Sequence, residues 1–194
     1  FSLSATTGAG KTVMAAAVIE SLFFGSHEFD FEADPTATVL WFSDSPDLNE
    51  QSRGRIQTAA SELDSRLRVI ETTFAEDRLQ PGHVYFLNTQ KLSKTSRLVR
   101  GATPTDPNED ELALLPRPDT MQQNIYDILT NTIQDKGTTL YFVLDEAHRG
   151  MGSQNRDRAT IVQRLINGHG GVPPMPIVFG ISATVERFEA AMRG

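Results

Sequence analysis

The chain has 194 residues and a formal net charge of −7, because 25 acidic side chains outnumber 18 basic ones. Hydrophobic residues make up 39% of it and charged residues 22%, so it can bury the core of one domain and is not a disordered chain. It has no cysteine, which excludes disulfides, thiolate metal sites and a cysteine nucleophile.

The chain opens with a predicted strand, a glycine-rich turn and a helix, all within residues 1–24. The turn is Thr-Thr-Gly-Ala-Gly at 6–10, and the Ala-rich segment from 11 to 20 is almost unbroken by polar side chains. A turn of small residues between two apolar segments is typical of a strand-to-helix connection. We therefore predict a strand before residue 6 and a buried helix after residue 10.

Residues 5–12 match the phosphate-binding pattern Gly-x-x-x-x-Gly-Lys-Ser/Thr, except that Ala5 replaces the first glycine. Glycines at 8 and 10 allow backbone N–H groups to turn towards an anion, and the start of the helix adds its positive end. Lys11 would reach the β- and γ-phosphates, and the hydroxyl of Thr12 would ligate Mg²⁺. The alternative is a glycine-rich turn without a ligand. The predicted nucleotide-binding residues are Thr7, Gly8, Ala9, Gly10, Lys11 and Thr12.

The rest of the chain alternates apolar runs with helix-like segments. Residues 103–119 contain four prolines and several acids, which predicts a surface loop or insertion. The alternation predicts an α/β fold with a parallel sheet. Strands are predicted at 38–42, 68–71, 84–87, 139–144 and 176–181, and helices at 47–67, 121–134 and 159–166.

The apolar strand at 140–144 ends in two adjacent acids, Asp145 and Glu146. Open parallel sheets bind their ligands at the carboxyl ends of the strands, where these acids would lie. Asp145 can hold Mg²⁺ directly or through water, and Glu146 can orient and deprotonate an attacking water. The alternative is that both acids only cap the next helix. We predict catalytic roles for Lys11, Asp145 and Glu146, and a metal site at Thr12 and Asp145.

Nothing in the sequence predicts a membrane segment or a leader. The longest apolar runs, such as 13–19 and 140–144, are far shorter than the roughly 20 residues that a membrane helix needs. The chain opens at Phe1 almost inside a motif, and no charged start or cleavage site precedes it. We expect a cytoplasmic piece of a longer protein. The histidines at 27, 83 and 169 lack a metal-binding spacing and are assigned no function.

Three segments together resemble motifs I, II and III of superfamily 2 helicases of the DEAD/DEAH-box type. They are residues 7–12, Asp-Glu-Ala-His at 145–148 and Ser-Ala-Thr at 182–184. They occur in the family's order and span nearly the whole chain, and the family tolerates Ala5. Segments at 40–51, 86–93 and 148–151 are most similar to Res subunits of type III restriction enzymes.

This resemblance implies that residues 1–194 form the first of two RecA-like domains, a three-layer α/β/α P-loop NTPase domain with a mainly parallel sheet. It implies hydrolysis of ATP with Mg²⁺, weak in this chain alone because the second domain supplies the arginines. His148, Ser182, Ala183 and Thr184 would couple the nucleotide site to nucleic acid and to the second domain. The alternatives are a histidine satisfied by its neighbours and a turn after the last strand.

The resemblance also implies nucleic-acid contacts at two strand ends. The family's motif Ia corresponds to 42–46 and its motif Ib to 88–91, and short hydroxyl and amide side chains suit contacts to a sugar-phosphate backbone. Each segment could instead be a capped strand-to-helix turn. Asp44 would repel phosphate unless it points away or pairs with a cation such as Arg53. The predicted contacts are Ser43, Ser45, Asn88, Thr89, Gln90 and Lys91.

By the same resemblance, the function is that of an ATP-dependent helicase or translocase motor acting on DNA rather than RNA, in a restriction or phage-defence system. Its partners would be nucleic acid, the second RecA-like domain, and nuclease or methyltransferase subunits. Two alternatives stay open: a DEAH-type RNA helicase, and a nucleotide-gated assembly switch that does not translocate. The net charge of −7 and Asp44 keep the switch open.

Overall fold

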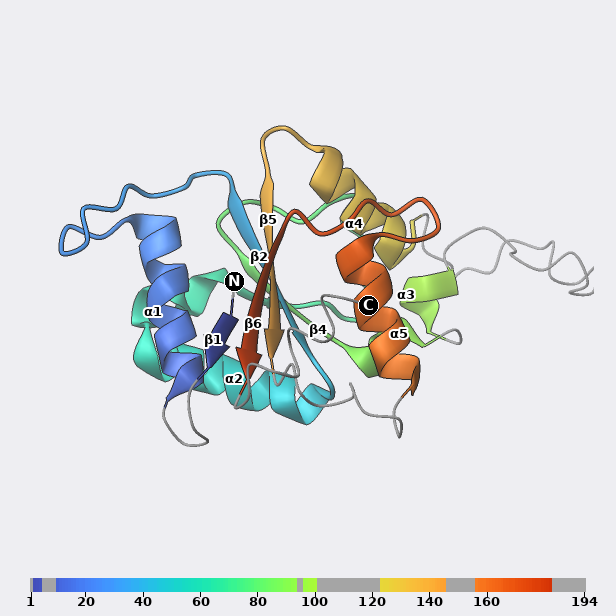
Figure 1. Ribbon diagram of the computed structural model, residues 1–194, viewed down its shortest axis with the longest axis horizontal. Helices are drawn as coiled ribbons and strands as arrows, with labels where there is room; N and C mark the ends of the chain where they lie inside the picture. The colour runs from blue at the N-terminus through green and yellow to red at the C-terminus, as the bar shows by residue number, and fades with distance from the viewer. Residues whose placement is uncertain (1, 5–9, 94–95, 101–122, 146–155, 183–194) are drawn as a thin grey trace, which may run out of the picture.

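Six strands form the centre of the computed structural model, with helices on both faces of the sheet (Figure 1). The structure describes residues 2–4, 10–93, 96–100, 123–145 and 156–182. Every strand pairing within these residues is parallel. The strands are β1 (Ser2–Ser4), β2 (Ala37–Ser43), β3 (Leu67–Val69), β4 (Val84–Asn88), β5 (Thr139–Asp145) and β6 (Ile177–Ser182). Their order across the sheet is β1-β6-β5-β2-β4-β3.

The direction in which the chain crosses the sheet decides which face each helix covers. The crossovers that follow β1 and β2 run towards the β3 edge of the sheet, and their helices lie on one face. The crossovers that follow β4 and β5 run back towards β1, and their helices cover the opposite face (Figure 1). Right-handed crossovers produce this switch of face whenever the direction reverses. The helices are α1 (Lys11–Phe24), α2 (Pro46–Ala59), α3 (Arg97–Arg100), α4 (Ile125–Gln134) and α5 (Arg156–Asn167), with 3-10 helices η1 (Ser61–Arg66) and η2 (Thr89–Leu92).

Each face of the sheet has its own hydrophobic core. On the face covered by α1 and α2, Trp41 packs with Ile56 and other apolar side chains. On the face covered by α4 and α5, Phe42 packs with Phe142. Trp41 and Phe42 are consecutive and fully buried, because successive side chains of a strand point to opposite faces. The fold is therefore the predicted three-layer α/β/α arrangement, and the apolar run at 38–42 has the continuous hydrophobicity of a doubly covered strand.

The three strands that lead into the predicted motifs are neighbours. Strand β6 lies between β1 and β5, so that Ser4 pairs with Ser182 and Asp145 pairs with Ile181. Adjacent strands lie about 4.8 Å apart, which separates the carboxyl ends of β1 and β5 by only about 10 Å. The carboxyl ends of β1, β5 and β6 therefore lie at the same edge of the sheet.

Several predicted boundaries are wrong, and the two largest differences lie at helix ends. The helix predicted at 47–67 ends at Ala59, because Ala60 takes the non-helical angles φ −138° and ψ 81°, and the 3-10 helix η1 follows. The helix predicted at 121–134 begins at Ile125, where Asn124 caps it. The predicted loop at 103–119 lies outside the described residues.

Helix α1 is less buried than its sequence predicts. Val13, Met14 and Val18 expose 48%, 45% and 56% of their surface. The helix lies on the outside of the sheet, so only one of its sides meets the core, and alanines allow that side to approach closely. The buried side consists of Thr12, Ala15, Ala16, Ile19 and Leu22.

Candidate nucleotide and metal site

Gly10 forms the N-cap of α1 with left-handed backbone angles, φ 74° and ψ 27°. L side chains rarely adopt this conformation, so the turn into the helix requires a residue such as glycine. The carbonyl oxygen of Gly10 accepts a hydrogen bond from Met14 N at 3.0 Å, which starts the helical ladder. The first turn of α1, which begins at Lys11, has no acidic side chain. The positive end of the helix dipole at this turn therefore favours an anion.

Asp145 ends β5 and exposes only 7% of its surface. Its Oδ2 accepts a hydrogen bond from Ser52 Oγ at 2.6 Å and a second from Trp41 Nε1 at 3.2 Å. Ser52 belongs to α2 and Trp41 to β2, so a helix and a strand both hold the carboxylate. Two donors that converge on one oxygen suit an ionised carboxylate, which only accepts hydrogen bonds.

The oxygen atoms of Thr12 and Asp145 are of the kind that fits a magnesium ion. Thr12, in the first turn of α1, is as buried as Asp145, with 7% of its surface exposed. Magnesium prefers hard oxygen ligands and usually takes one or two carboxylates together with phosphate oxygens and water. The described residues contain no group of three or more His, Cys, Asp or Glu that could hold a metal ion. One carboxylate and one hydroxyl suit Mg²⁺ that takes its other ligands from nucleotide phosphates and water.

Beside Asp145, the end of β2 forms a second buried polar cluster. Ser43 is fully buried, and its Oγ lies 2.7 Å from Asn49 Oδ1 and 3.0 Å from the carbonyl oxygen of Ser45. Ser45 caps α2, because its Oγ accepts a hydrogen bond from Leu48 N at 3.3 Å. Asn49 is also buried, and its Nδ2 has no hydrogen-bond partner among the described residues. Ser43 therefore supports the turn from beneath, while Ser45 is partly exposed.

The ends of β2 and β4, where nucleic-acid contacts are predicted, lie side by side. Ser43 and Asn88 pair in register, and Thr89 Oγ1 donates a hydrogen bond to the carbonyl oxygen of Ser43 at 3.4 Å. Asn88 is buried and caps η2, because its Oδ1 accepts a hydrogen bond from Lys91 N at 3.2 Å. Gln90 is exposed. The structure thus brings the two segments into one surface, with Ser43 and Asn88 beneath it.

Two basic side chains near this surface, Lys91 and Arg53, are paired with acids. Lys91 Nζ forms an ion pair with Glu71 Oε2 at 3.0 Å and donates a hydrogen bond to the carbonyl oxygen of Ile70. The guanidinium of Arg53 makes two hydrogen bonds to Glu50, at 2.8 and 3.1 Å. Both pairs reduce the net positive charge that these residues offer to a phosphate.

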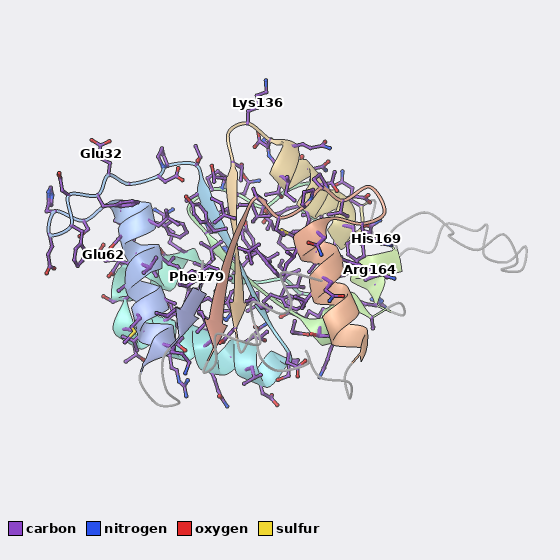
Figure 2. All side chains as sticks on the ribbon, in the orientation of Figure 1. Glu32, Glu62, Lys136, Arg164, His169 and Phe179 are labelled. Carbon is purple, nitrogen blue, oxygen red and sulfur yellow. The ribbon has the colours of Figure 1, made fainter. Side chains whose placement is uncertain are left out.

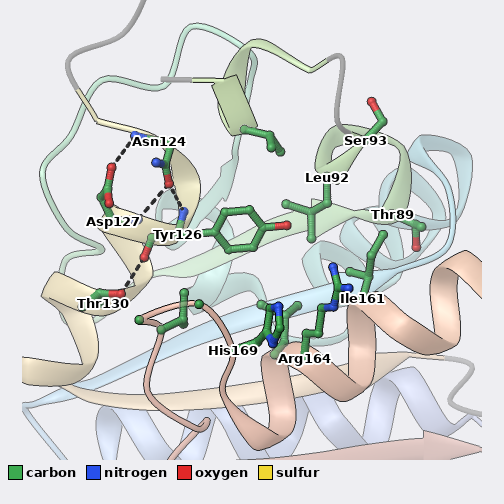
Figure 3. Close-up of a pocket in the computed structure, with 15 residues that line it drawn as sticks. Thr89, Leu92, Ser93, Asn124, Tyr126, Asp127, Thr130, Ile161, Arg164 and His169 are labelled. Atoms are coloured by element: carbon green, nitrogen blue, oxygen red, sulfur yellow. Dashed lines mark hydrogen bonds between the residues drawn. The ribbon is translucent and has the colours of Figure 1, made fainter. Parts of the chain in front are cut away.

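A pocket of about 950 Å³ opens beside Thr89, between η2, α3, α4 and α5 (Figure 3). Its lining includes Tyr126 from α4, Arg164 from α5 and His169 from the loop that follows α5. Burial raises the pKa of the Tyr126 hydroxyl above its ordinary 10.0, although the nearby charge of Arg164 acts in the opposite direction. Figure 2 shows Arg164 and His169 on the side of the molecule away from α1.

Sequence reasoning did not find this pocket. Arg164 lies in a helical segment with ordinary surface charges, and His169 has no partner at a recognisable spacing. The pocket forms because α4 and α5 cover the same face of the sheet, although more than 20 residues separate them along the chain. No local pattern in the sequence carries that information.

Several predicted site residues lie outside the described part of the chain. Ser182 is described only as the last residue of β6, and Lys11 as the first residue of α1. Within the described residues no helix is both long and apolar enough to cross a membrane. The residues outside the description are Thr7, Gly8, Ala9, Glu146, His148, Ala183 and Thr184.

A parallel sheet covered on both faces, a left-handed glycine at the start of the first helix and a buried aspartate at the end of β5 define a P-loop NTPase domain of the RecA-like type. A family model described as type III restriction enzyme, res subunit, matches residues 1–187, and the chain belongs to this family. No curated protein matches the chain. The family makes the chain, in general terms, an ATP-hydrolysing, helicase-like motor domain that uses nucleotide and Mg²⁺ and interacts with nucleic acid.

Proposed function

We propose that this domain hydrolyses Mg-ATP to drive movement of its protein along DNA, in a restriction or phage-defence system. The observation that carries the proposal is the adjacency of β1, β6 and β5 at one sheet edge. The three segments that resemble helicase motifs I, II and III follow or overlap the ends of these strands. Membership of the type III Res family supports the same function.

In this proposal each residue of the nucleotide site has a separate task. The backbone of residues 7–10 surrounds the phosphates, and Lys11 binds the β- and γ-phosphates. Thr12 and Asp145 hold Mg²⁺, which when bound neutralises charge on the phosphate oxygens. Glu146 accepts a proton from the attacking water as the water oxygen bonds to the γ-phosphorus. The bond between that phosphorus and the bridging oxygen breaks, which releases ADP and phosphate.

We assign the coupling of hydrolysis to movement to residues beyond the phosphate site. His148, Ser182, Ala183 and Thr184 carry this role in the proposal, since imidazole and hydroxyl groups can rearrange hydrogen bonds when the γ-phosphate leaves. A second RecA-like domain supplies the arginines that stabilise the transition state. Such an arginine contributes a factor of roughly 10³ to 10⁵ in rate, so this domain alone should turn over slowly.

For the nucleic-acid interface we propose two kinds of residue. Ser45, Thr89, Gln90 and Lys91 contact the sugar-phosphate backbone. Two buried residues, Ser43 and Asn88, lie beneath this surface and hold its turns through the hydrogen bonds described above. Sequence-independent contacts of this kind suit a protein that moves along a strand.

The direct test is steady-state ATPase activity of the full-length protein without nucleic acid and with single-stranded DNA, duplex DNA or RNA. We expect DNA to stimulate turnover, and we expect the stimulation to fall steeply with salt because phosphate contacts release counterions. Glu146→Gln should bind Mg-ATP but lose nearly all turnover, whereas Lys11→Ala should weaken nucleotide binding itself. Unchanged turnover in Glu146→Gln would remove Glu146 as the base.

A second candidate function is a nucleotide-gated switch that binds partner proteins without moving along nucleic acid. The ion pair of Lys91 with Glu71 favours it, because this pair weakens the attraction of the surface for phosphate. ATPase activity that stays at its basal rate with every nucleic acid would support the switch and contradict the motor function. Stimulation by RNA alone would instead support a DEAH-type RNA helicase.

A further inference from the structure

Asp145 is held by two side chains that no motif of the sequence predicts. Trp41 is the single tryptophan of the chain and is fully buried, and Ser52 exposes only 4% of its surface. In the sheet Trp41 pairs with Val143, two residues before Asp145. The indole therefore reaches diagonally along β5 to the carboxylate at its end, on the face that α2 covers.

The geometry of the two hydrogen bonds fixes the carboxylate group. The bond from Ser52 Oγ is 2.6 Å long, the length typical of a hydroxyl that donates to an ionised carboxylate. The bond from Trp41 Nε1 is 3.2 Å long and comes from the neighbouring strand. One donor belongs to the sheet and one to the helix above it, so rotation of the Asp145 side chain would break at least one of them.

We propose that Trp41 and Ser52 are positioning residues of the magnesium site, an inference that rests on the proposed function. They set the orientation of Asp145 before metal and nucleotide arrive. They also make β2 and α2 part of that site, although the proposed mechanism gives neither element a contact with the nucleotide. Groups that hydrogen-bond to a metal ligand commonly change metal affinity about 10- to 100-fold when they are removed.

The test measures metal binding separately from catalysis. Binding of Mn²⁺ to the ADP-bound chain is followed by the electron paramagnetic resonance of the free ion, and ADP affinity is measured without metal. For Ser52→Ala and Trp41→Phe we expect Mn²⁺ affinity to fall about 10- to 100-fold. The affinity for metal-free ADP should stay the same, and Ser52→Thr, which keeps a hydroxyl, should recover part of the metal affinity.

Matched controls separate positioning from general destabilisation. Thr132→Ala removes a buried hydroxyl that bonds to the backbone of α4 and of residue 79. Phe42→Leu removes a buried ring from the same strand as Trp41 but on the opposite face. Both controls should leave Mn²⁺ affinity unchanged. Unchanged Mn²⁺ affinity in Ser52→Ala, or an equal loss of metal-free ADP affinity, would overturn the proposal.

The unmodified chain offers a second measurement, which does not depend on whether a variant folds. Because Trp41 is the single tryptophan and contacts Asp145, its fluorescence should change when Mg²⁺ is added to the ADP-bound chain. A tryptophan emission spectrum that does not change when Mg²⁺ is added contradicts the proposal. The variant Asp145→Asn separates the proposed metal site from the positioning role. If Asp145→Asn leaves Mn²⁺ affinity intact, the proposed metal site itself is wrong. If Mn²⁺ affinity falls in Asp145→Asn but not in Ser52→Ala, only the positioning role is refuted.

Discussion

Among single residues outside the site, Asp34 links two segments at the amino ends of the strands, because its carboxylate accepts three hydrogen bonds. Its Oδ1 accepts hydrogen bonds from Thr36 N at 2.9 Å and Thr36 Oγ1 at 2.6 Å, and its Oδ2 accepts one from Tyr141 Oη at 3.1 Å. Partial burial raises the pKa of Asp34, but the hydrogen bonds from Thr36 and Tyr141 outweigh burial and place the pKa below its ordinary 3.8. The ionised carboxylate thus ties the loop before β2 to β5.

Replacing Asp34 should change stability in a pH-dependent way. Because the pKa of Asp34 is lower in the folded chain, folding favours the ionised form, and this contribution is complete above pH 3.8 and lost as the pH falls through the folded pKa. We expect Asp34→Asn to cost about 1 kcal/mol at pH 7, as for a partly exposed hydrogen bond. Urea unfolding at a series of pH values should show the difference shrinking below pH 3.8; a difference that grows there would contradict this role.

At the scale of elements, α4 depends on the cap at its start. Asn124 Oδ1 accepts hydrogen bonds from Tyr126 N at 2.8 Å and Asp127 N at 3.0 Å, and Asp127 Oδ2 accepts one from Asn124 N at 3.0 Å. These reciprocal bonds form a capping box, which satisfies three N–H groups that the helix itself leaves without partners. The cap also fixes Tyr126 in the wall of the pocket (Figure 3).

Asn124→Ala should therefore destabilise the chain by about 1 kcal/mol, the usual cost of losing an N-cap side chain. Asn124→Gly is the matched comparison, because glycine at an N-cap usually costs only a few tenths of a kcal/mol. Denaturant midpoints of the two variants and of the unmodified chain, measured at one pH, test these differences. A midpoint of Asn124→Ala equal to that of the unmodified chain would mean that the capping box adds nothing to stability.

Elements of the fold could be predicted because their signals are local. The apolar run at 38–42 and the acids after 139–144 mark their strands directly, and the glycine at 10 marks the turn into α1. The end of α2 was missed because Ala59 and Ala60 both favour helix, and only tertiary packing decides where the helix stops. The exposure of Val13 and Val18 depends likewise on where α1 sits.

The residues of the candidate site likewise fall into those that local patterns indicate and those that depend on the tertiary structure. Short patterns were enough to propose Gly10, Thr12 and Asp145 as site residues, since each pattern reflects a local chemical requirement. The partners of Asp145 could not, because Trp41 and Ser52 lie about 100 residues away along the chain, 104 and 93 residues respectively. Their contact depends on strand order, which places β2 beside β5.

For the whole molecule, nucleotide binding should appear as added stability. A ligand that binds only the folded chain at 100 times its Kd stabilises it by about 2.7 kcal/mol, which corresponds to a rise in Tm of about 5–10 °C for a domain of this size. We expect Mg-ADP to raise the Tm of this chain by that amount. Lys11→Ala should remove most of the shift, and an identical shift in that variant would place the nucleotide elsewhere.

The position of β6 has a consequence for the order in which the protein can be made. Strand β1, the first of the described strands along the chain, forms the edge of the described sheet and pairs with β6, the last described strand to be synthesised. Within the described sheet, β1 therefore has no neighbouring strand until Ile177–Ser182 has been translated. A nascent chain stalled before residue 177 would contain the proposed phosphate-binding sequence and yet lack the strand that pairs with β1.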